Sequence, residues 1–280
     1  MLVPKARSYI RINTILIIGA TAGIGEAFTH RFHAMGKKII GAGRNREKLQ
    51  SMASELPGLE TRRFDISGLT ALPANVNGIL KDFPSLDTVL ITAGTQLSYN
   101  LFDLSTTTPE SINAEVTTNL TAPALLIRLF APHLLQLASK GTKTTLFMTS
   151  SSLGYMPLSF YPTYCAAKSG VQALVKTLRQ QLAFAPNGAN MRVVEIVPPY
   201  TDTDLDKAHR EAMIVVQGGP EKAFPAMPLG EFVDKFFESL EQPGEDGEIK
   251  KEIGVGFGET GVHVWRDNFG KMYKQMGIET

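Results

Sequence analysis

The sequence contains a single cysteine, Cys165, so no disulfide can form within the chain. No apolar run approaches the length of a membrane span, and the N-terminal region lacks the apolar block of a signal peptide. Neither sign of charge dominates, because 28 basic and 27 acidic residues leave a formal net charge of +1. Nucleic-acid-binding domains usually carry a clustered basic face. These absences exclude a disulfide framework and predict neither a membrane span nor a nucleic-acid partner.

Chain length and the N-terminal sequence bear on domain number and location. A chain of 280 residues suits one α/β domain, and no repeat or low-complexity block divides it. Three basic residues, Lys5, Arg7 and Arg11, precede the first acid, Glu26. A short mitochondrial address stays open on this pattern, but a flexible tail over residues 1–12 is the favoured interpretation. We therefore expect a cytoplasmic protein.

Segments typical of strands and of helices alternate along most of the chain. This alternation is typical of a parallel sheet covered by helices on both faces. We therefore expect an α/β fold in one domain, residues 1–280, with a doubly wound parallel sheet of about seven strands. The predicted strands lie near residues 13–18, 37–43, 59–64, 86–92, 143–149, 191–197 and 251–255. The predicted helices lie near residues 23–35, 45–55, 69–82, 109–138, 162–184 and 229–240, and the Thr108 hydroxyl is expected to cap the fourth. Apolar residues at helical spacing predict a buried face on the last: Phe232, Val233, Phe236, Phe237 and Leu240.

A glycine-rich turn follows the first predicted strand. The segment Gly19-Ala20-Thr21-Ala22-Gly23-Ile24-Gly25 leads directly into a helical pattern that starts at Glu26. Glycines allow a tight turn and close backbone approach, and a helix N-terminus offers unpaired N–H groups to a pyrophosphate. A glycine cluster alone is a weak signal, but the order strand, turn, helix favours a dinucleotide site.

Tyr164 and Lys168 form a potential proton-transfer pair. They stand four residues apart on a predicted helix, so their side chains share one face. A free phenol has a pKa of about 10, and a neighbouring cation lowers that pKa toward the working range of a general acid or base. Ser151 lies thirteen residues upstream of Tyr164 and could hold a substrate oxygen against the phenol. Taken alone, Tyr-x-x-x-Lys also occurs by chance on helices.

Together, the Gly-x-x-x-Gly-x-Gly turn, Ser151 and Tyr164-x-x-x-Lys168 resemble the short-chain dehydrogenases/reductases over about residues 13–205. The resemblance implies a Rossmann fold and adds Asn119, in Thr118-Asn119-Leu120, as a fourth catalytic position. It also implies that Asp65 faces an adenine and that the segment after the sixth strand folds over a nicotinamide. The implied cofactor contacts are Gly19, Thr21, Gly23, Ile24, Gly25, Asp65, Ile66, Ala93, Gly94, Tyr164, Lys168, Pro198, Thr201 and Thr203.

Three positions depart from the family pattern. Ile18 replaces a threonine before the first glycine, and Thr92 replaces the asparagine of Asn-Ala-Gly, so neighbouring strands must be tied together differently. Pro199 replaces the glycine of Pro-Gly, and this Pro-Pro form with Glu195 before it resembles the DltE-like subgroup. None of these positions carries a reacting group, so the departures concern substrate and loop geometry.

The residue after the second predicted strand bears on which nicotinamide cofactor binds. An acid there would hold the ribose 2′-hydroxyl of NAD, whereas arginine accommodates the 2′-phosphate of NADP. Here Arg44 and Arg46 follow the strand, and no acid appears before Glu47. The planar fork of Arg44 suits a phosphate; alternatively, both arginines simply start the next helix in water. The pattern favours NADPH/NADP over NAD.

The resemblance implies a carbonyl-reduction mechanism. Ser151 would hydrogen-bond the substrate oxygen, and Tyr164 would deliver the proton as a hydride reaches carbon. Lys168 would lower the Tyr164 pKa and bind the nicotinamide ribose, while Asn119 would hold a water that links Lys168 to solvent. Two alternatives stay open: an enzyme of this fold that catalyses isomerisation or cyclisation, and a non-enzymatic protein that senses NADPH.

The expected partner is a small carbonyl or alcohol. Its pocket would be drawn from residues 95–101, 152–160 and 200–228, of which the last is an irregular substrate loop. Aromatic residues in and beside these segments predict a bulky, moderately hydrophobic molecule: Tyr99, Tyr155, Phe160, Tyr161 and Tyr200.

Other features concern assembly and metals. Apolar helices near residues 109–138 and 162–184 resemble the pair by which the family forms homodimers or homotetramers. The five histidines share no ligand spacing with cysteine or paired acids, so no metal site is predicted. Trp265 belongs to a tail that packs either on the substrate site or elsewhere.

Overall fold

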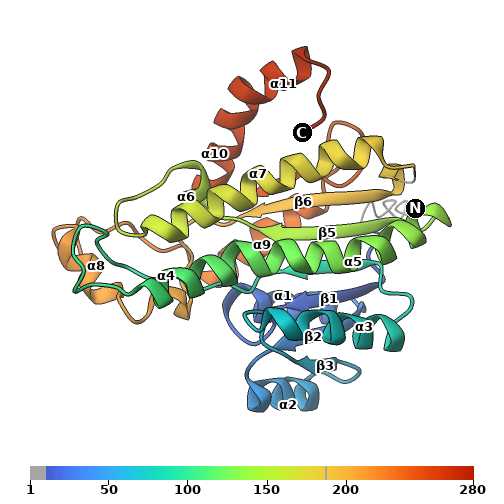
Figure 1. The fold of residues 1–280 in the computed structure, drawn as a ribbon, viewed down its shortest axis with the longest axis horizontal. Coiled ribbons are helices and arrows are strands. Elements are labelled where there is room, and N and C mark those ends of the chain that lie inside the picture. Colours follow the sequence, from blue (N-terminus) through green and yellow to red (C-terminus); the bar gives the residue numbers. More distant parts are fainter. Residues whose placement is uncertain (1–10, 187) are drawn as a thin grey trace, which may run out of the picture.

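The computed structural model describes residues 11–186 and 188–280, in which seven parallel strands form one sheet in the order β3-β2-β1-β4-β5-β6-β7 (Figure 1). This order confirms the predicted doubly wound α/β fold, because the direction of winding reverses between β1 and β4. The strands are β1 Thr14–Ile18, β2 Lys38–Gly43, β3 Glu60–Arg63, β4 Thr88–Ile91, β5 Thr144–Thr149, β6 Met191–Val197 and β7 Glu252–Gly254. The helices are α1 Gly23–Ala34, α2 Arg46–Glu55, α3 Leu72–Asp82, α4 Pro109–Val116, α5 Ala122–Ser139, α6 Ser152–Tyr155, α7 Pro162–Phe184, α8 Arg210–Val216, α9 Leu229–Leu240, α10 Phe257–Trp265 and α11 Lys271–Gln275.

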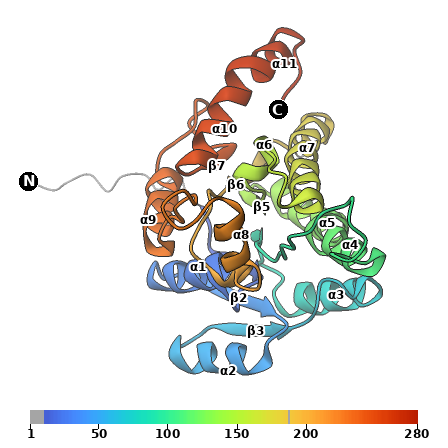
Figure 2. The same cartoon turned by 90° about the vertical axis from the view of Figure 1, so that its left-hand side faces the viewer.

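Two helical layers cover the sheet (Figure 2). Successive side chains of a strand point to opposite faces. On β1, Leu16 and Ile18 join a core with α3, α5 and α7, whereas Ile15 and Ile17 join a core with α1 and α9. Because both faces of β1 are buried, its sequence is apolar throughout rather than alternating.

Helix α9 packs through phenylalanines onto α1. The predicted apolar face of α9 is confirmed, since Phe232, Phe236 and Phe237 are all buried. Phe28 of α1 stacks on Phe236 with ring centroids 4.4 Å apart and meets Phe237 edge-on at 5.5 Å. This cluster fixes α1, and therefore the turn before it, against the sheet.

We expect Phe236→Ala to lower the free energy of unfolding by about 3–5 kcal/mol, because the ring is fully buried and its loss leaves a cavity. Chemical denaturation monitored by circular dichroism measures this change. Phe184→Ala is the matched control, since Phe184 is 90% exposed and its loss should change stability by less than about 0.5 kcal/mol. Equal effects of the two substitutions would contradict this account of the core.

The long predicted helix over residues 109–138 is divided in the structure. Thr108 accepts a hydrogen bond from the Ser111 amide and, as predicted, starts α4. Between α4 and α5 the chain makes a wider π turn over Thr117–Thr121, which includes Asn119. Such turns are frequent at functional sites, and nothing in the sequence signals this one.

Two further expectations are corrected, and a tail for which no structure was predicted forms helices. The region 200–228 is not wholly irregular, because it contains α8 and a bridge between Thr201 and Met227. The tail beyond residue 256 forms α10 and α11, which extend away from the sheet (Figure 1). The predicted tail 1–12 lies mostly outside the described residues, but Ile12 is buried in the core and so is not part of a free tail.

The expectation about membrane spans also needs correction. In the described part of the chain, Pro109–Ser139 is long and apolar enough, by length and composition alone, to cross a bilayer. A third of its most apolar stretch is buried here. Leu126, Phe130 and Leu134 pack into the core over the sheet, which explains their apolar character.

Candidate active site

The glycine turn lies at the carboxyl end of β1 and leaves no room for side chains. A Cβ on Gly25 would lie 2.1 Å from the Gly19 carbonyl oxygen, and one on Gly19 would lie 2.5 Å from the Ala93 amide nitrogen. Helix α1 starts here with Ala22 at its N-cap, so no side chain caps its first N–H groups. An uncapped helix N-terminus beside a close-packed turn suits a phosphate, so the residues present fit the expected dinucleotide.

Thr92 forms the connection between neighbouring strands that the family's asparagine was expected to make. Its hydroxyl donates to the Ile18 carbonyl at 3.0 Å, and the Ala93 amide donates to the same oxygen at 3.0 Å. These bonds join the ends of β4 and β1. A hydroxyl therefore performs the task that the sequence comparison assigned to the missing asparagine.

The four predicted catalytic residues are all buried, and the structure brings them together at this edge of the sheet. Gly94 lies beside two of them, because a Cβ there would lie 2.9 Å from Asn119 Oδ1 and 3.8 Å from Lys168 Nζ. Lys168 Nζ donates to the Thr149 carbonyl at 2.9 Å and lies 5.6 Å from the centre of the Tyr164 ring.

The two remaining side chains are held by backbone groups. Ser151 Oγ accepts a hydrogen bond from the Leu153 amide at 3.1 Å and so caps α6. This bond uses a lone pair and leaves the hydroxyl proton able to donate. The Asn119 amide makes two bonds to the backbone of Thr95, accepting at 3.1 Å and donating at 2.8 Å. Asn119 thereby secures the loop after β4.

Burial controls the acidity of Tyr164 and Lys168. Burial raises the pKa of the Tyr164 phenol above its ordinary value, and the neighbouring Ser151 hydroxyl acts in the opposite direction. Burial also lowers the pKa of Lys168 to about 8. The effect of Lys168 on the Tyr164 pKa stays a prediction, because burial is the main cause of the shift seen here.

The outer part of the predicted cofactor site gathers at the ends of β2 and β3. Arg44 is 74% exposed at its side chain, and its Nη1 lies 3.7 Å from Asp65 Oδ2. Arg63, which sequence reasoning did not single out, donates through Nε to the Arg44 carbonyl at 3.2 Å. Ile66 is buried in the core. Two guanidinium groups and one carboxylate thus lie together where an adenosine end would lie.

The segment after β6 closes against the glycine turn. A Cβ on Gly23 would lie 3.3 Å from Thr203 Cβ, and one on Gly43 would lie 2.7 Å from Thr21 Cγ2. The Pro198 carbonyl accepts from the Ser152 amide at 2.9 Å. Thr21, Ala93 and Thr203 therefore lie against the glycine turn or the end of β2, and Ile24 is partly buried on α1; their contacts with a cofactor stay a prediction.

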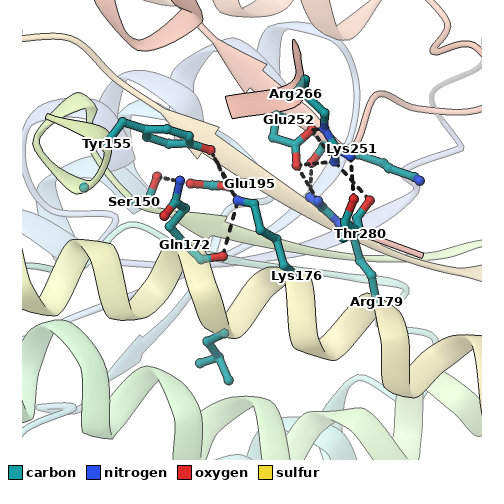
Figure 3. Close-up of polar contacts among 12 residues, drawn as sticks. Ser150, Tyr155, Gln172, Lys176, Arg179, Glu195, Lys251, Glu252, Arg266 and Thr280 are labelled. Carbon is teal, nitrogen blue, oxygen red and sulfur yellow. Dashed lines mark hydrogen bonds and ion pairs between the residues drawn. The ribbon is translucent and has the colours of Figure 1, made fainter. Parts of the chain in front are cut away.

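The sequence did not predict the contacts of Glu195, a buried carboxylate beside the segment that carries Ser151. Glu195 of β6 has no exposed surface and accepts from the Ser150 hydroxyl at 2.6 Å and the Tyr155 hydroxyl at 2.9 Å (Figure 3). Lys176 Nζ lies 3.3 Å from the same carboxylate. The sequence offered one sign of this network, because Glu195 is an acid within the otherwise mostly apolar strand Met191–Val197. This network holds both ends of the segment that carries Ser151.

The C-terminal tail packs away from Tyr164. Glu252 of β7 binds Arg179 and Arg266, and Arg266 also reaches Thr280 (Figure 3). Lys176 Nζ lies 4.4 Å from the centre of a Trp265 ring. Trp265 therefore packs over Lys176 beside the Glu195 network, and Gly261 of the same helix packs against Tyr155, in the predicted substrate segment 152–160.

Carboxylates bind the hydroxyls of three aromatic residues predicted to line the substrate site. Tyr99 donates to Glu115 at 3.3 Å, Tyr155 to Glu195 at 2.9 Å and Tyr200 to Asp206 at 2.7 Å. These phenols stabilise the surrounding loops, so only their rings remain for an apolar ligand.

Comparisons with known proteins agree with this geometry. A family profile described as short chain dehydrogenase matches residues 13–214. The uncharacterized oxidoreductase DltE of Bacillus subtilis (strain 168) is 28% identical over 269 residues, which cover 95% of this chain and 97% of that protein. The dehydrogenase/reductase SDR family member 7B of Bos taurus is 28% identical over 211 residues, which cover 72% of this chain and 62% of that protein.

Solved structures share the fold at low identity. A short-chain dehydrogenase from Sphingobium yanoikuyae in complex with NADPH superposes with a TM-score of 0.74 at 22% identity, covering 95% of both chains. A short chain dehydrogenase/reductase from Burkholderia phymatum in complex with NAD gives 0.72 at 18% identity, covering 94% of this chain and 95% of that one. The bulky-bulky ketone specific alcohol dehydrogenase from Comamonas testosteroni gives 0.72 at 22% identity, covering 94% of both.

Proposed function

The chain belongs to the short chain dehydrogenase family, and from this premise we propose that it is an NADPH-dependent oxidoreductase. In this proposal it transfers a hydride between the nicotinamide and a moderately hydrophobic ketone or alcohol. The observation that carries the proposal is the approach of Asn119 and Lys168 to Gly94, with the Tyr164 ring 5.6 Å from Lys168 Nζ, at the strand ends where α1 begins with an uncapped N-terminus. A non-redox relative need not retain all these groups.

The protein's own groups would bind the substrate oxygen and move a proton. When bound, the nicotinamide supplies the hydride. The Ser151 hydroxyl donates a hydrogen bond to the substrate oxygen. Tyr164 transfers to that oxygen the proton that completes the alcohol. The raised pKa of Tyr164 suits carbonyl reduction, because the phenol must hold its proton until the substrate arrives. Lys168, with a pKa of about 8, is mostly protonated near neutrality and binds the ribose hydroxyls.

The preference for NADPH rests on Arg44. Proteins of this fold bind either cofactor, since the Sphingobium structure holds NADPH and the Burkholderia structure holds NAD. Asp65 orients the Arg44 guanidinium at the end of β2, and Arg63 adds a second positive charge there. No acid occupies the position that would bind a ribose 2′-hydroxyl.

We expect Arg44→Asp to lower the ratio of kcat/KM for NADPH over NADH by about 100-fold, since a bidentate phosphate contact is lost and a repulsive charge is added. Steady-state kinetics with both cofactors measure the ratio. Arg46→Asp makes the same charge change two residues later, on α2, and should alter the ratio less than about fivefold. Equal effects would assign the preference to general electrostatics rather than to Arg44.

The proposed activity is tested by loss of NADPH absorbance across a panel of ketones, aldehydes and quinones. The panel starts with bulky ketones, because the Comamonas enzyme of this fold is specific for them. Turnover of at least one carbonyl supports the proposal. Tight NADPH binding without turnover of any compound would favour the cofactor-sensing alternative, and conversion without a change in NADPH would favour isomerisation or cyclisation.

A further inference from the structure

Glu115 is a buried carboxylate next to the catalytic helix. It lies on α4, one residue before that helix ends, and its surface is fully buried. Three donors from other elements bind it: the Leu97 amide at 2.7 Å, the Tyr99 hydroxyl at 3.3 Å and the Thr163 hydroxyl. Three donors on one side chain suit an ionised carboxylate, which only accepts hydrogen bonds.

The contacts of Glu115 connect the loop after β4 with the start of α7. Thr163 is the residue before Tyr164, and its hydroxyl lies beside the Tyr99 hydroxyl. Leu97 and Tyr99 belong to the loop that Asn119 secures through Thr95. The phenol of Tyr164 therefore sits on a helix whose first turn is anchored to a single carboxylate.

Glu115 differs from the other buried glutamates of the chain in its charge environment. Glu195 is paired with Lys176, and Glu252 with Arg179 and Arg266 (Figure 3). Among residues 11–186 and 188–280, no lysine, arginine or histidine forms an ion pair with Glu115. Glu115 is therefore held by hydrogen-bond donors and by no ion pair among the described residues.

We propose that Glu115 is a positioning residue for Tyr164, because it holds Thr163, the residue before Tyr164, in place. In a second, electrostatic part of the proposal, the Glu115 carboxylate also acts on the Tyr164 phenol. The consequence of Glu115 for catalysis rests on the proposed function. The effect of Glu115 on the Tyr164 phenol does not. The groups that face Tyr164 are Ser151 at the start of α6, Tyr161, Cys165 and Lys168 on or beside α7, and Glu115 on α4. Burial is the main cause of the raised Tyr164 pKa, and the charge of Glu115 acts in the same direction.

A direct test titrates the phenol without any substrate. A fluorinated tyrosine at position 164 has a more acidic phenol, which brings its ionisation into a range where the protein stays folded, and fluorine NMR reports it alone. We expect Glu115→Gln to lower the titration midpoint by about 0.5 to 1 pH unit, because an unpaired charge is removed. A midpoint unchanged within about 0.2 unit would overturn the electrostatic part of the proposal.

Asp87→Asn is the matched control. Asp87 is also a buried carboxylate bound by three donors, Asn13 N, Thr14 N and Thr88 Oγ1, but it precedes β4 at the opposite edge of the sheet. It should leave the Tyr164 midpoint unchanged. An equal shift in this variant would show that any loss of buried charge has the same effect, and would contradict a specific role for Glu115.

Thr163→Val tests the positioning part and keeps the carboxylate. We expect kcat for carbonyl reduction to fall about tenfold or more while the KM for NADPH stays within about twofold, since the helix start loses its anchor but the glycine turn is untouched. An unchanged kcat would overturn the positioning role even if Glu115→Gln fails to fold. If no carbonyl is reduced by the wild-type protein, the proposed function fails, whereas the NMR titration still decides the effect of Glu115 on the phenol.

Discussion

Tyr164→Phe is expected to abolish NADPH-linked reduction while NADPH binding stays within about twofold. The substitution removes only the hydroxyl, and general acid catalysis of this kind contributes about 100- to 10,000-fold. The ring is 5% exposed and its burial is kept, so the fold should be retained. Turnover is measured with the best carbonyl from the panel, and binding by fluorescence titration of NADPH.

The control for this prediction is Tyr273→Phe. Tyr273 lies on α11 and stacks on Trp265 with ring centroids 5.9 Å apart, far along the chain from the catalytic groups. Its loss of a hydroxyl should leave kcat unchanged. If Tyr164→Phe keeps the wild-type kcat, another group must deliver the proton, and the proposed mechanism is wrong. If it loses NADPH binding as well as turnover, the phenol acts in cofactor binding rather than in proton transfer.

Gly25→Ala is expected to weaken NADPH binding by at least about 100-fold, because the new methyl group cannot be accommodated without moving the turn. A Cβ there would lie 2.1 Å from the Gly19 carbonyl oxygen and 2.5 Å from Thr92 Oγ1. Relief of that clash separates the start of α1 from β1 and β4, which is where the phosphate would bind. Isothermal titration calorimetry with NADPH measures the loss.

Gly78→Ala is the matched control, because a Cβ at that position on α3 meets nothing within 4 Å. It should leave NADPH affinity unchanged and raise stability by up to about 1 kcal/mol, as expected for glycine to alanine inside a helix. Wild-type affinity in Gly25→Ala would show that the turn does not form the cofactor site. Loss of binding caused by global unfolding of Gly25→Ala would say nothing about the turn. The circular dichroism spectra of Gly25→Ala and Gly78→Ala are therefore compared to show that both variants are folded.

Local sequence patterns predicted the fold well. Each of the seven strands was placed to within two residues, and α7 and α9 were placed at their observed bounds. These elements are specified locally, since an uninterrupted apolar run makes a buried strand and a 3.6-residue apolar period makes a packed helix. The Thr108 cap and the burial of Phe236 followed from the same kind of pattern.

Contacts between distant segments were not predictable. The sequence does not show the partners of Glu115 on α4 or of Glu195 in an apolar strand, and only folding brings Thr163 to the first and Lys176 to the second. The π turn at Asn119 and the packing of Trp265 over Lys176 likewise depend on neighbours that lie far along the chain.

The sequence by itself determined which groups stand on one helix face or at one strand end, because helix and strand geometry is repetitive and local. It therefore identified the glycine turn, Ser151, and the spacing of Tyr164 and Lys168. Only the tertiary structure decided how far those groups are removed from water. Burial raises the pKa of Tyr164 and lowers that of Lys168, because desolvation depends on every element packed around a side chain and not on its neighbours in sequence.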